Sequence, residues 1–370
     1  MRILHTESSL GWGGQELRIL TEAAGLRRRG HDVRVASPRE ATIFSEAERF
    51  DIPVIALPIG RKGPVGLVAL RRTLASERFD VVNSHSSTDS WLAGLACRAL
   101  WLGRRRPPAL VRTRHISARV PTGAATRWLY TRATAEIVTT GDAIRQQLIV
   151  ENGVSPARVT SIPTGIDLER FTPGDKPAAR RALQLPEATP LIGIVATLRS
   201  WKGHRYLVEA LTLSTHRDAQ LVIVGGGPQA DAIKAQVRAL GLGARVRLVG
   251  NQWDVVPWLR AIDVFALPSY ANEGVPQALL QAMAVGAPCV STDAGAIGEI
   301  AISDATALVV AKQNAVALAA AIDRLLDDAA LAERLVWSAR DRVQTKFGIA
   351  AMLDRMETVF RRAADANRYR

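Results

Sequence analysis

Residues 264–291 of the chain read VFALPSYANEGVPQALLQAMAVGAPCVS. The apolar run Val264–Leu267 predicts a strand that is buried on both faces. Pro276 suits the start of a helix, where its missing N–H is not needed, and the apolar spacing carries that helix to Val285. A second apolar run at 288–291 predicts the next strand. A strand, a helix and a strand in this order form a parallel β-α-β unit, so the segment predicts an α/β fold.

The same alternation extends from this segment toward both ends of the chain. A first series of strands is predicted at residues 1–6, 32–37, 54–58, 80–84, 109–113, 135–139 and 159–162. A second series is predicted at residues 191–196, 220–224, 246–248, 264–267, 288–291 and 307–310. Helical patterns separate the strands, so each series predicts a doubly wound parallel sheet. The expected fold class is α/β, with two Rossmann-like domains that face a central cleft.

The length of the chain agrees with two domains. It has 370 residues, and one α/β core of this kind takes roughly 150–200. Pro173-Gly174, within a polar stretch, indicates a turn between the two series. The predicted domains are therefore 1–170 and 171–345. A last helical segment at 346–370 is expected to return to the N-terminal domain.

The cysteines and the N-terminus indicate the compartment. Cys97 and Cys289 lie in runs that read as buried helix and strand, which favours a reducing environment over a disulfide framework. Met1-Arg2-Ile3-Leu4 enters the first predicted strand directly, so no signal peptide is expected. No apolar stretch reaches about 18 uncharged residues, so no transmembrane helix is expected. These features predict a cytoplasmic protein.

The chain carries a net charge of +13, most of it in the N-terminal half. A basic surface suits nucleic acid, an anionic membrane or a phosphorylated small molecule. Nucleic acid is not expected as a partner, because the arginines lack interleaved aromatic residues and no recognised binding module is present. A solvated face, or a preference for arginine in the source genome, would give the same charge. We favour peripheral docking on the cytoplasmic face of an anionic inner membrane.

The loop before the helix at Pro276 can bind an anionic ligand. A helix N-terminus offers free N–H groups and a partial positive charge, so a diphosphate could rest beside Gly274 and Val275. Glu273 lies next to this point and Gln281 lies deeper along the helix, which would allow one to meet a sugar hydroxyl and the other a ribose. The alternative is that Glu273 only complements the helix dipole and binds no ligand.

Residues 269–283 resemble the Glu-x7-Glu signature of the retaining GT-B glycosyltransferases of family 4, the glycosyl transferases group 1. The resemblance implies that Glu273 is a catalytic residue that contacts the hydroxyls of the donor sugar. The chain departs from the signature at Gln281, which replaces the second Glu, whose expected role is to contact the ribose. A glutamine can accept a hydrogen bond and also donate one, so ribose binding is expected to survive.

A second segment, residues 196–204, resembles the Gly-Arg-Leu…Lys-Gly stretch with which the family holds the donor diphosphate. Lys202 matches in place, whereas Thr197 stands at the usual arginine position and Arg199 lies two residues later. We expect Arg199 and Lys202 to clamp the diphosphate. The alternative is that both are solvated cations in a loop and bind no ligand. The turn containing Gly226 resembles the Gly-x-Gly-Pro turn that lies close to the nucleotide in this family.

In the N-terminal half, residues 11–16 resemble the Gly-Gly-x-Glu loop of the family. The resemblance implies that Gly13 and Gly14 face the donor phosphate and that Glu16 faces the acceptor. Glycines at this position also permit a close approach of the backbone to a ligand.

Two of the six histidines, His85 and His115, follow predicted strands of the N-terminal half. Both are expected at the carboxyl ends of those strands, facing the cleft. The resemblance implies that His115 is a catalytic contact to the donor sugar or the acceptor. For His85, a place in the acceptor cleft and a purely structural role stay equally open.

The resemblance implies a hexosyl transfer, with retention, from a nucleotide-diphosphate sugar to a hydroxyl of a saccharide or a lipid-linked saccharide. Lipopolysaccharide or surface-polysaccharide assembly is the expected pathway. No cofactor and no metal ion are expected, because the sequence has no Asp-x-Asp pair and no His/Cys cluster with ligand spacing. Two alternatives stay open: a nucleotide-sugar epimerase or phosphorylase on the same fold, and a non-catalytic sugar-nucleotide binding protein, which Gln281 makes conceivable.

Overall fold

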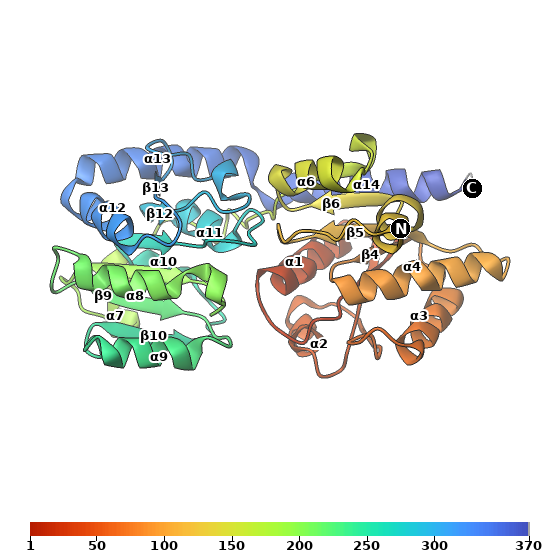
Figure 1. Cartoon of the computed structure of the whole chain (residues 1–370), viewed down its shortest axis with the longest axis horizontal. Helices are drawn as coiled ribbons and strands as arrows, with labels where there is room; N and C mark the ends of the chain where they lie inside the picture. The colour runs from red at the N-terminus through yellow and green to blue at the C-terminus, as the bar shows by residue number, and fades with distance from the viewer. Residues whose placement is uncertain (369–370) are drawn as a thin grey trace. The chain divides into compact units, whose positions relative to one another are not determined.

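The computed structural model describes residues 1–368, which form two compact units (Figure 1). Unit 1 contains Met1–Pro163 and the described residues from Ala350 to residue 368, and unit 2 contains Thr164–Ile349. Each unit is a parallel sheet with helices, so the predicted class of two Rossmann-like α/β domains is confirmed.

The predicted domain boundaries follow residues 170 and 345, whereas the contacts divide the chain after Pro163 and Ile349. Residues 369 and 370, at the end of the predicted C-terminal segment, lie outside the described part of the chain. Among residues 1–368, no helix combines the length and the apolar character that crossing a bilayer requires.

Unit 1 is built on a seven-stranded sheet in which all neighbouring strands are parallel. From one edge to the other, the strands are β3 (Val54–Ala56), β2 (Asp32–Ser37), β1 (Arg2–Thr6), β4 (Val81–Ser84), β5 (Ala109–Arg114), β6 (Glu136–Thr139) and β7 (Val159–Ser161). The order reverses between β1 and β4, which is the point where open α/β sheets bind their ligands. The central strands β1, β4, β5 and β6 are buried along almost their whole length, as expected for a parallel sheet with helices on both faces.

The helices of unit 1 cover both faces of this sheet (Figure 1). They are α1 (Gly14–Arg28), α2 (Thr42–Glu46), α3 (Pro64–Glu77), α4 (Ser87–Leu102), α5 (Ala124–Trp128), α6 (Asp142–Asn152) and α14 (Ile349–Arg368). Three short turns join them, η1 (Ala47–Phe50), the π-helical η2 (Leu129–Ala133) and η3 (Pro156–Arg158).

The last helix, α14, packs on unit 1 although it follows unit 2 in the chain (Figure 1). Leu353 lies against α1 at Gly25, where an added Cβ would be 2.5 Å from the leucine side chain. Arg362 donates to both carboxylate oxygens of Glu136 in β6, at 2.8 and 2.7 Å. The preceding helix, α13, packs within unit 2 instead, so only the last of the C-terminal helices returns to the N-terminal unit.

Unit 2 is built on a six-stranded parallel sheet. Its strands are, in order, β10 (Val246–Gly250), β9 (Gln220–Val224), β8 (Leu191–Val195), β11 (Val264–Leu267), β12 (Cys289–Ser291) and β13 (Leu308–Val309). Its helices and short turns are α7 (Lys176–Ala182), η4 (Ser200–Lys202), α8 (His204–Leu213), α9 (Ala230–Ala239), α10 (Val256–Ala261), α11 (Gln277–Val285), η5 (Ile297–Glu299), α12 (Ala315–Asp327) and α13 (Ala329–Lys346).

Two details of unit 2 differ from the sequence-based prediction. Helix α7 lies where a linker was expected; its N-cap, Asp175, accepts a hydrogen bond from the N–H of Ala178 at 3.0 Å. The buried residues of this helix are Ala179 and Arg180, so no apolar run marks it in the sequence. Helix α11 begins at Gln277, with Pro276 as its N-cap, one residue later than predicted.

Candidate active site

In unit 2, β8 and β11 are neighbours at the point where the strand order reverses. The chain leaves β8 toward β9 on one side of the sheet, whereas β11 leads to β12 on the other side. The register pairs Ile192 with Val264, and both strands run in the same direction. The loops that follow them, residues 196–203 and 268–276, therefore start side by side, at the edge where such sheets bind ligands.

An ion pair joins these two loops. Nζ of Lys202, in η4, donates to Oε1 of Glu273 at 2.7 Å. The two side chains are 20% and 6% exposed, so water screens the pair only weakly. The N–H of Tyr270 donates to the carbonyl of Trp201 at 2.8 Å, and the carbonyl of Glu273 accepts from the N–H of Ala296 at 3.2 Å. The Tyr270–Trp201 bond therefore joins the two loops through the backbone, and the Ala296–Glu273 bond ties the second loop to the connection after β12.

Two glycines allow the loops to lie this close. Gly203 has φ of +76°, and a Cβ at this residue would lie 2.0 Å from the carbonyl oxygen of Pro268. Gly225, in the turn after β9, has φ of +141°, and its Cβ would lie 2.0 Å from the carbonyl oxygen of Ala196. Any other residue at either position would push apart the loops that follow β9, β8 and β11.

The other donor residues predicted in unit 2 lie in the loops after β8, β9 and β11 and in α11. The guanidinium of Arg199 is exposed and lies over the ring of Trp201, 5.7 Å from its centre. Gly226 belongs to the glycine turn after β9, and its carbonyl accepts from the N–H of Leu198 at 2.9 Å. The remaining three are buried in the loop before α11 and in its second turn, and they are Gly274, Val275 and Gln281.

Unit 1 places three histidines in a chain at the carboxyl ends of β1, β4 and β5. Nδ1 of His5 lies 2.9 Å from Nε2 of His85, and Nδ1 of His85 lies 2.9 Å from Nε2 of His115. Burial lowers the pKa of all three, that of His5 to about 3, and the positive charge of Arg18 lowers them further. The rings are therefore neutral, with one N–H each, so every contact in the chain joins one donor to one acceptor.

Two buried carboxyl groups that the sequence analysis did not identify lie beside the histidines. Asp89, in the first turn of α4, accepts hydrogen bonds from the hydroxyl of Thr6 and the N–H of His85, at 2.8 and 2.9 Å. Glu7 follows β1 and accepts from the hydroxyl of Ser86. Burial and then the charge of Glu7 raise the pKa of Asp89 to about 7, and burial also raises the pKa of Glu7.

Asp89 could have been found from the sequence, because Ser86 and Asp89 have the spacing of a capping box, and the structure contains that box. No local pattern marks Glu7.

The predicted residues of the glycine loop lie at the same end of the sheet: Gly13 is the N-cap of α1 and Gly14 begins it. Glu16 is buried in the first turn of α1, where burial and then the charge of Glu7 raise its pKa to about 7.

Both halves of the chain match known families. Residues 175–342 match the family described as Glycosyl transferases group 1, and residues 12–170 match Glycosyltransferase Family 4. The chain belongs to the group 1, family 4 glycosyl transferases. The first matched region contains the Lys202–Glu273 pair, and the second contains His85, His115 and Asp89.

Similar proteins agree with this family. D-inositol 3-phosphate glycosyltransferase of Corynebacterium diphtheriae is 28% identical, over 96% of this chain and 94% of its own length. HepE of Anabaena, solved in complex with UDP and glucose, has a TM-score of 0.84 at 20% identity, over 97% of this chain and 98% of its own. WaaG, described as a glycosyltransferase involved in lipopolysaccharide biosynthesis, has a TM-score of 0.75 at 17% identity, over 97% of this chain and 99% of its own. The structural likenesses confirm the predicted GT-B fold of the glycosyltransferase.

Lowering the pH from 7 to 5 should destabilise the glycosyltransferase through His5. The pKa of this ring is about 3 when folded and 6.5 when unfolded, so the unfolded chain takes up the proton first. The stability contributed by the neutral ring is complete above pH 6.5 and is lost as the pH falls toward 3, by about 2 kcal/mol at pH 5.

The measurement is urea unfolding of the native protein and of His5→Gln at pH 7 and pH 5. The glutamine keeps a hydrogen-bonding group next to His85 and removes the titration. Asp89 and Glu16 titrate in both proteins, so the difference between the two isolates His5. We expect the native protein to lose about 2 kcal/mol more than the variant. Equal losses would mean that the ring takes up a proton in the folded state as easily as in the unfolded one.

Proposed function

We propose that the protein transfers a hexosyl group from a nucleotide-diphosphate donor to a hydroxyl of a saccharide or lipid-linked saccharide, with retention of configuration. The observation that carries the proposal is the contact of Lys202 with Glu273 at the carboxyl ends of β8 and β11. The pair combines an ammonium, which suits a diphosphate, with a carboxylate, which suits sugar hydroxyls. The UDP and glucose bound by the structurally similar HepE support a donor of this class.

In the proposed complex the diphosphate lies between the Lys202 ammonium and the start of α11. The first N–H groups of a helix have no partner within it, so they can donate to phosphate oxygens near Gly274 and Val275. Arg199 is exposed and can move from its place over Trp201 to the same phosphates. These groups would stabilise the negative charge that grows on the leaving diphosphate as the glycosidic bond breaks.

The two loops contain a single carboxylate, which favours retention by front-face attack over a double displacement. In loops 196–203 and 268–276, Glu273 is the one Asp or Glu, and Lys202 engages it. A double displacement needs a nucleophile and a separate acid/base carboxyl group. We infer instead that the acceptor oxygen bonds to the anomeric carbon on the face from which the diphosphate departs. The acceptor proton then passes to a phosphate oxygen of the leaving group.

We also propose that transfer needs no metal ion. Among residues 1–368, no group of three or more His, Cys, Asp or Glu side chains is placed to hold one. Lys202 and Arg199 would supply the positive charge that a metal supplies to diphosphates in other enzymes. Gln281, buried in α11, would replace the carboxylate that binds the ribose, by accepting a hydrogen bond from one hydroxyl and donating one to the other.

Unit 1 is proposed to bind the acceptor. A neutral His115 at the end of the histidine chain can donate a hydrogen bond to, or accept one from, a sugar hydroxyl, and His85 and Glu16 lie at the same edge of the sheet. The Corynebacterium relative is named for D-inositol 3-phosphate, and WaaG is described by lipopolysaccharide biosynthesis. We propose an acceptor in lipopolysaccharide or surface-polysaccharide assembly, whose phosphates would suit the basic charge of the chain.

A two-step experiment tests the proposal. The first step is a thermal-shift screen with UDP-, GDP- and ADP-sugars, because a ligand of the folded state raises the melting temperature. The second incubates the best radiolabelled donor with D-inositol 3-phosphate or a lipid-linked saccharide, with and without EDTA, and determines the anomeric configuration of the product by NMR. We expect a retained product in both conditions. An inverted product, or activity abolished by EDTA, would contradict the mechanism. Conversion of the donor without an acceptor would indicate an epimerase, and binding without turnover a sensor.

A further inference from the structure

Unit 1 has a cavity at the amino ends of its strands, opposite the carboxyl ends where the histidine chain lies. Its volume is about 950 Å³, and it lies where the end of α4, the connection at 103–108 and the turn η2 meet. Ala109 and Leu110, at the start of β5, line its inner side. His115 follows the other end of that strand, about 20 Å away. The cavity is therefore separate from the proposed reaction site.

Arginine dominates the lining of this cavity, and no Asp or Glu contributes to it. The arginines are all exposed, and they are Arg98, Arg104, Arg105, Arg106 and Arg132. Within residues 1–368 none of the five forms an ion pair, in contrast to Arg2 with Asp32 at 3.1 Å and Arg29 with Asp354 at 2.7 Å. The C-terminus of α4 carries a partial negative charge of only about half an elementary charge. The helix dipole alone therefore does not account for five arginines without an ion pair.

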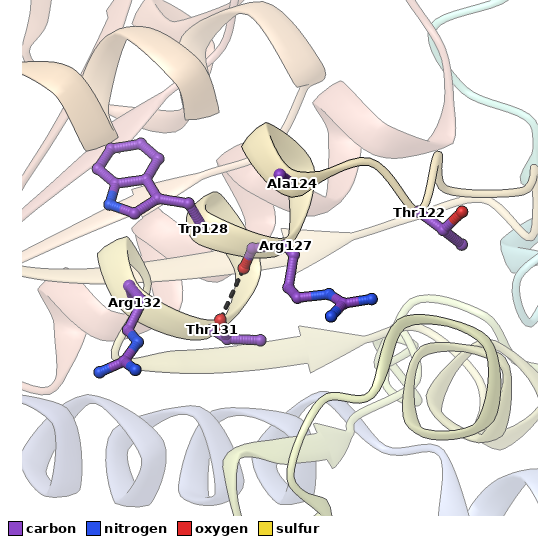
Figure 2. Close-up of a pocket in the computed structure, with 6 residues that line it drawn as sticks. All are labelled: Thr122, Ala124, Arg127, Trp128, Thr131 and Arg132. Atoms are coloured by element: carbon purple, nitrogen blue, oxygen red, sulfur yellow. Dashed lines mark hydrogen bonds between the residues drawn. The ribbon is translucent and has the colours of Figure 1, made fainter.

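A smaller cavity of about 350 Å³ adjoins the first and shares Trp128, Thr131 and Arg132 with it (Figure 2). Figure 2 shows the side chains of Arg127 and Arg132 extending away from α5 and η2. The hydroxyl of Thr131 donates to the carbonyl of Arg127 at 2.7 Å, which holds the two turns together. Arg127 adds a sixth exposed arginine to the same surface.

Apolar side chains stand next to these cations. Leu95, Trp101 and Leu102 are 41%, 55% and 64% exposed. Leu95, Arg98 and Leu102 are spaced three and seven residues apart on α4, so they share one face of the helix. The Arg98 guanidinium lies over the Trp101 ring, 4.3 Å from its centre. Exposed Trp and Leu beside Arg is the composition of surfaces that enter the headgroup region of a bilayer.

We propose that this basic cavity binds the phosphate headgroup of an anionic phospholipid and docks unit 1 on a membrane surface. Guanidinium groups bind phosphate through two parallel hydrogen bonds, and Trp101 and Leu102 enter the interface beside the headgroup. A single-stranded nucleic acid would instead need several free aromatic faces for its bases. Trp128 is engaged here with Trp91, with ring centroids 6.2 Å apart. The docking site does not depend on the proposed transfer, since its binding is measured without donor or acceptor.

The test is co-sedimentation of the full chain with vesicles of phosphatidylcholine alone or with about 30% phosphatidylglycerol. We expect binding to the anionic vesicles only, weakened by salt. In the variant Arg104→Asn/Arg105→Ser/Arg106→Ser, the partition coefficient should fall about a hundredfold, because each Arg at an anionic surface contributes roughly a factor of five. Asparagine is chosen at residue 104 because Arg104 has a φ of +56°, which asparagine tolerates.

The matched control is Arg28→Ser/Arg39→Ser/Arg61→Ser, which removes the same charge from exposed residues of unit 1 that line neither cavity. It should keep most of the binding, and equal losses in the two triple variants would overturn the proposed site.

Trp101→Ala should reduce binding severalfold. Calorimetry with inorganic phosphate and a filter assay with random RNA complete the test. Tighter binding of either probe than of the anionic vesicles would overturn the lipid assignment. All variants are first compared by melting temperature.

Discussion

Replacing Glu273→Gln is expected to lower kcat by about a thousandfold, with the fold of unit 2 unchanged. Oε1 of Glu273 accepts from Lys202 at 2.7 Å, and the second oxygen can accept from a hydroxyl of the donor sugar. A glutamine has the same shape, and its amide oxygen can still accept the lysine hydrogen bond, so packing is preserved. What is lost is the negative charge that orients the sugar and balances the positive charge developing on its ring. Steady-state kinetics with the donor identified by the thermal-shift screen measures the effect.

The matched control for this variant is Glu209→Gln, an exposed carboxylate on α8 in the same unit. It should retain full activity. The melting temperatures of both variants should stay within a few degrees of the native value, since a change of about 1 kcal/mol corresponds to roughly 2–8 °C. If Glu273→Gln kept more than a tenth of the native kcat, Glu273 would have only a structural role in holding Lys202.

The fold could be predicted from local pattern because its strands carry their own signal. β8, β9 and β11 are buried along almost their whole length, so each reads as a nearly unbroken apolar run between turn residues. Helix α7 has no such run, because its buried residues are Ala179 and Arg180 within a charged sequence. The return of α14 to unit 1 depends on contacts such as Arg362 with Glu136, which are 226 residues apart and leave no local trace.

Motifs predict several residues of the candidate site, but not the contacts between them. Lys202 and Glu273 each belong to a motif, yet only the adjacency of β8 and β11 brings them into contact. Likewise, His85 and His115 each follow a predicted strand, while their connection to His5 follows from the order β1, β4, β5. Sheet order is a property of the whole domain, and a motif does not encode it.

Replacing Lys202→Met is expected to raise the Kd for the nucleotide-sugar about thirtyfold, because a charge-assisted hydrogen bond to a phosphate contributes about 2 kcal/mol. The same change leaves the Glu273 carboxylate buried without its partner, which should lower the free energy of unfolding by about 2 kcal/mol. Calorimetry of donor binding and urea unfolding measure the two effects separately. Arg199→Met, at an exposed side chain over Trp201, should weaken donor binding without this loss of stability.

The double variant Lys202→Met/Glu273→Gln separates the two roles of the lysine. Removing both charges eliminates the unpaired buried carboxylate, so most of the lost stability should return. Donor affinity should not return, because the ammonium that the diphosphate needs is still absent. Recovery of both quantities would mean that Lys202 acts only by holding Glu273 in place, and that the diphosphate is bound elsewhere. Recovery of stability alone would assign the lysine to the donor phosphates.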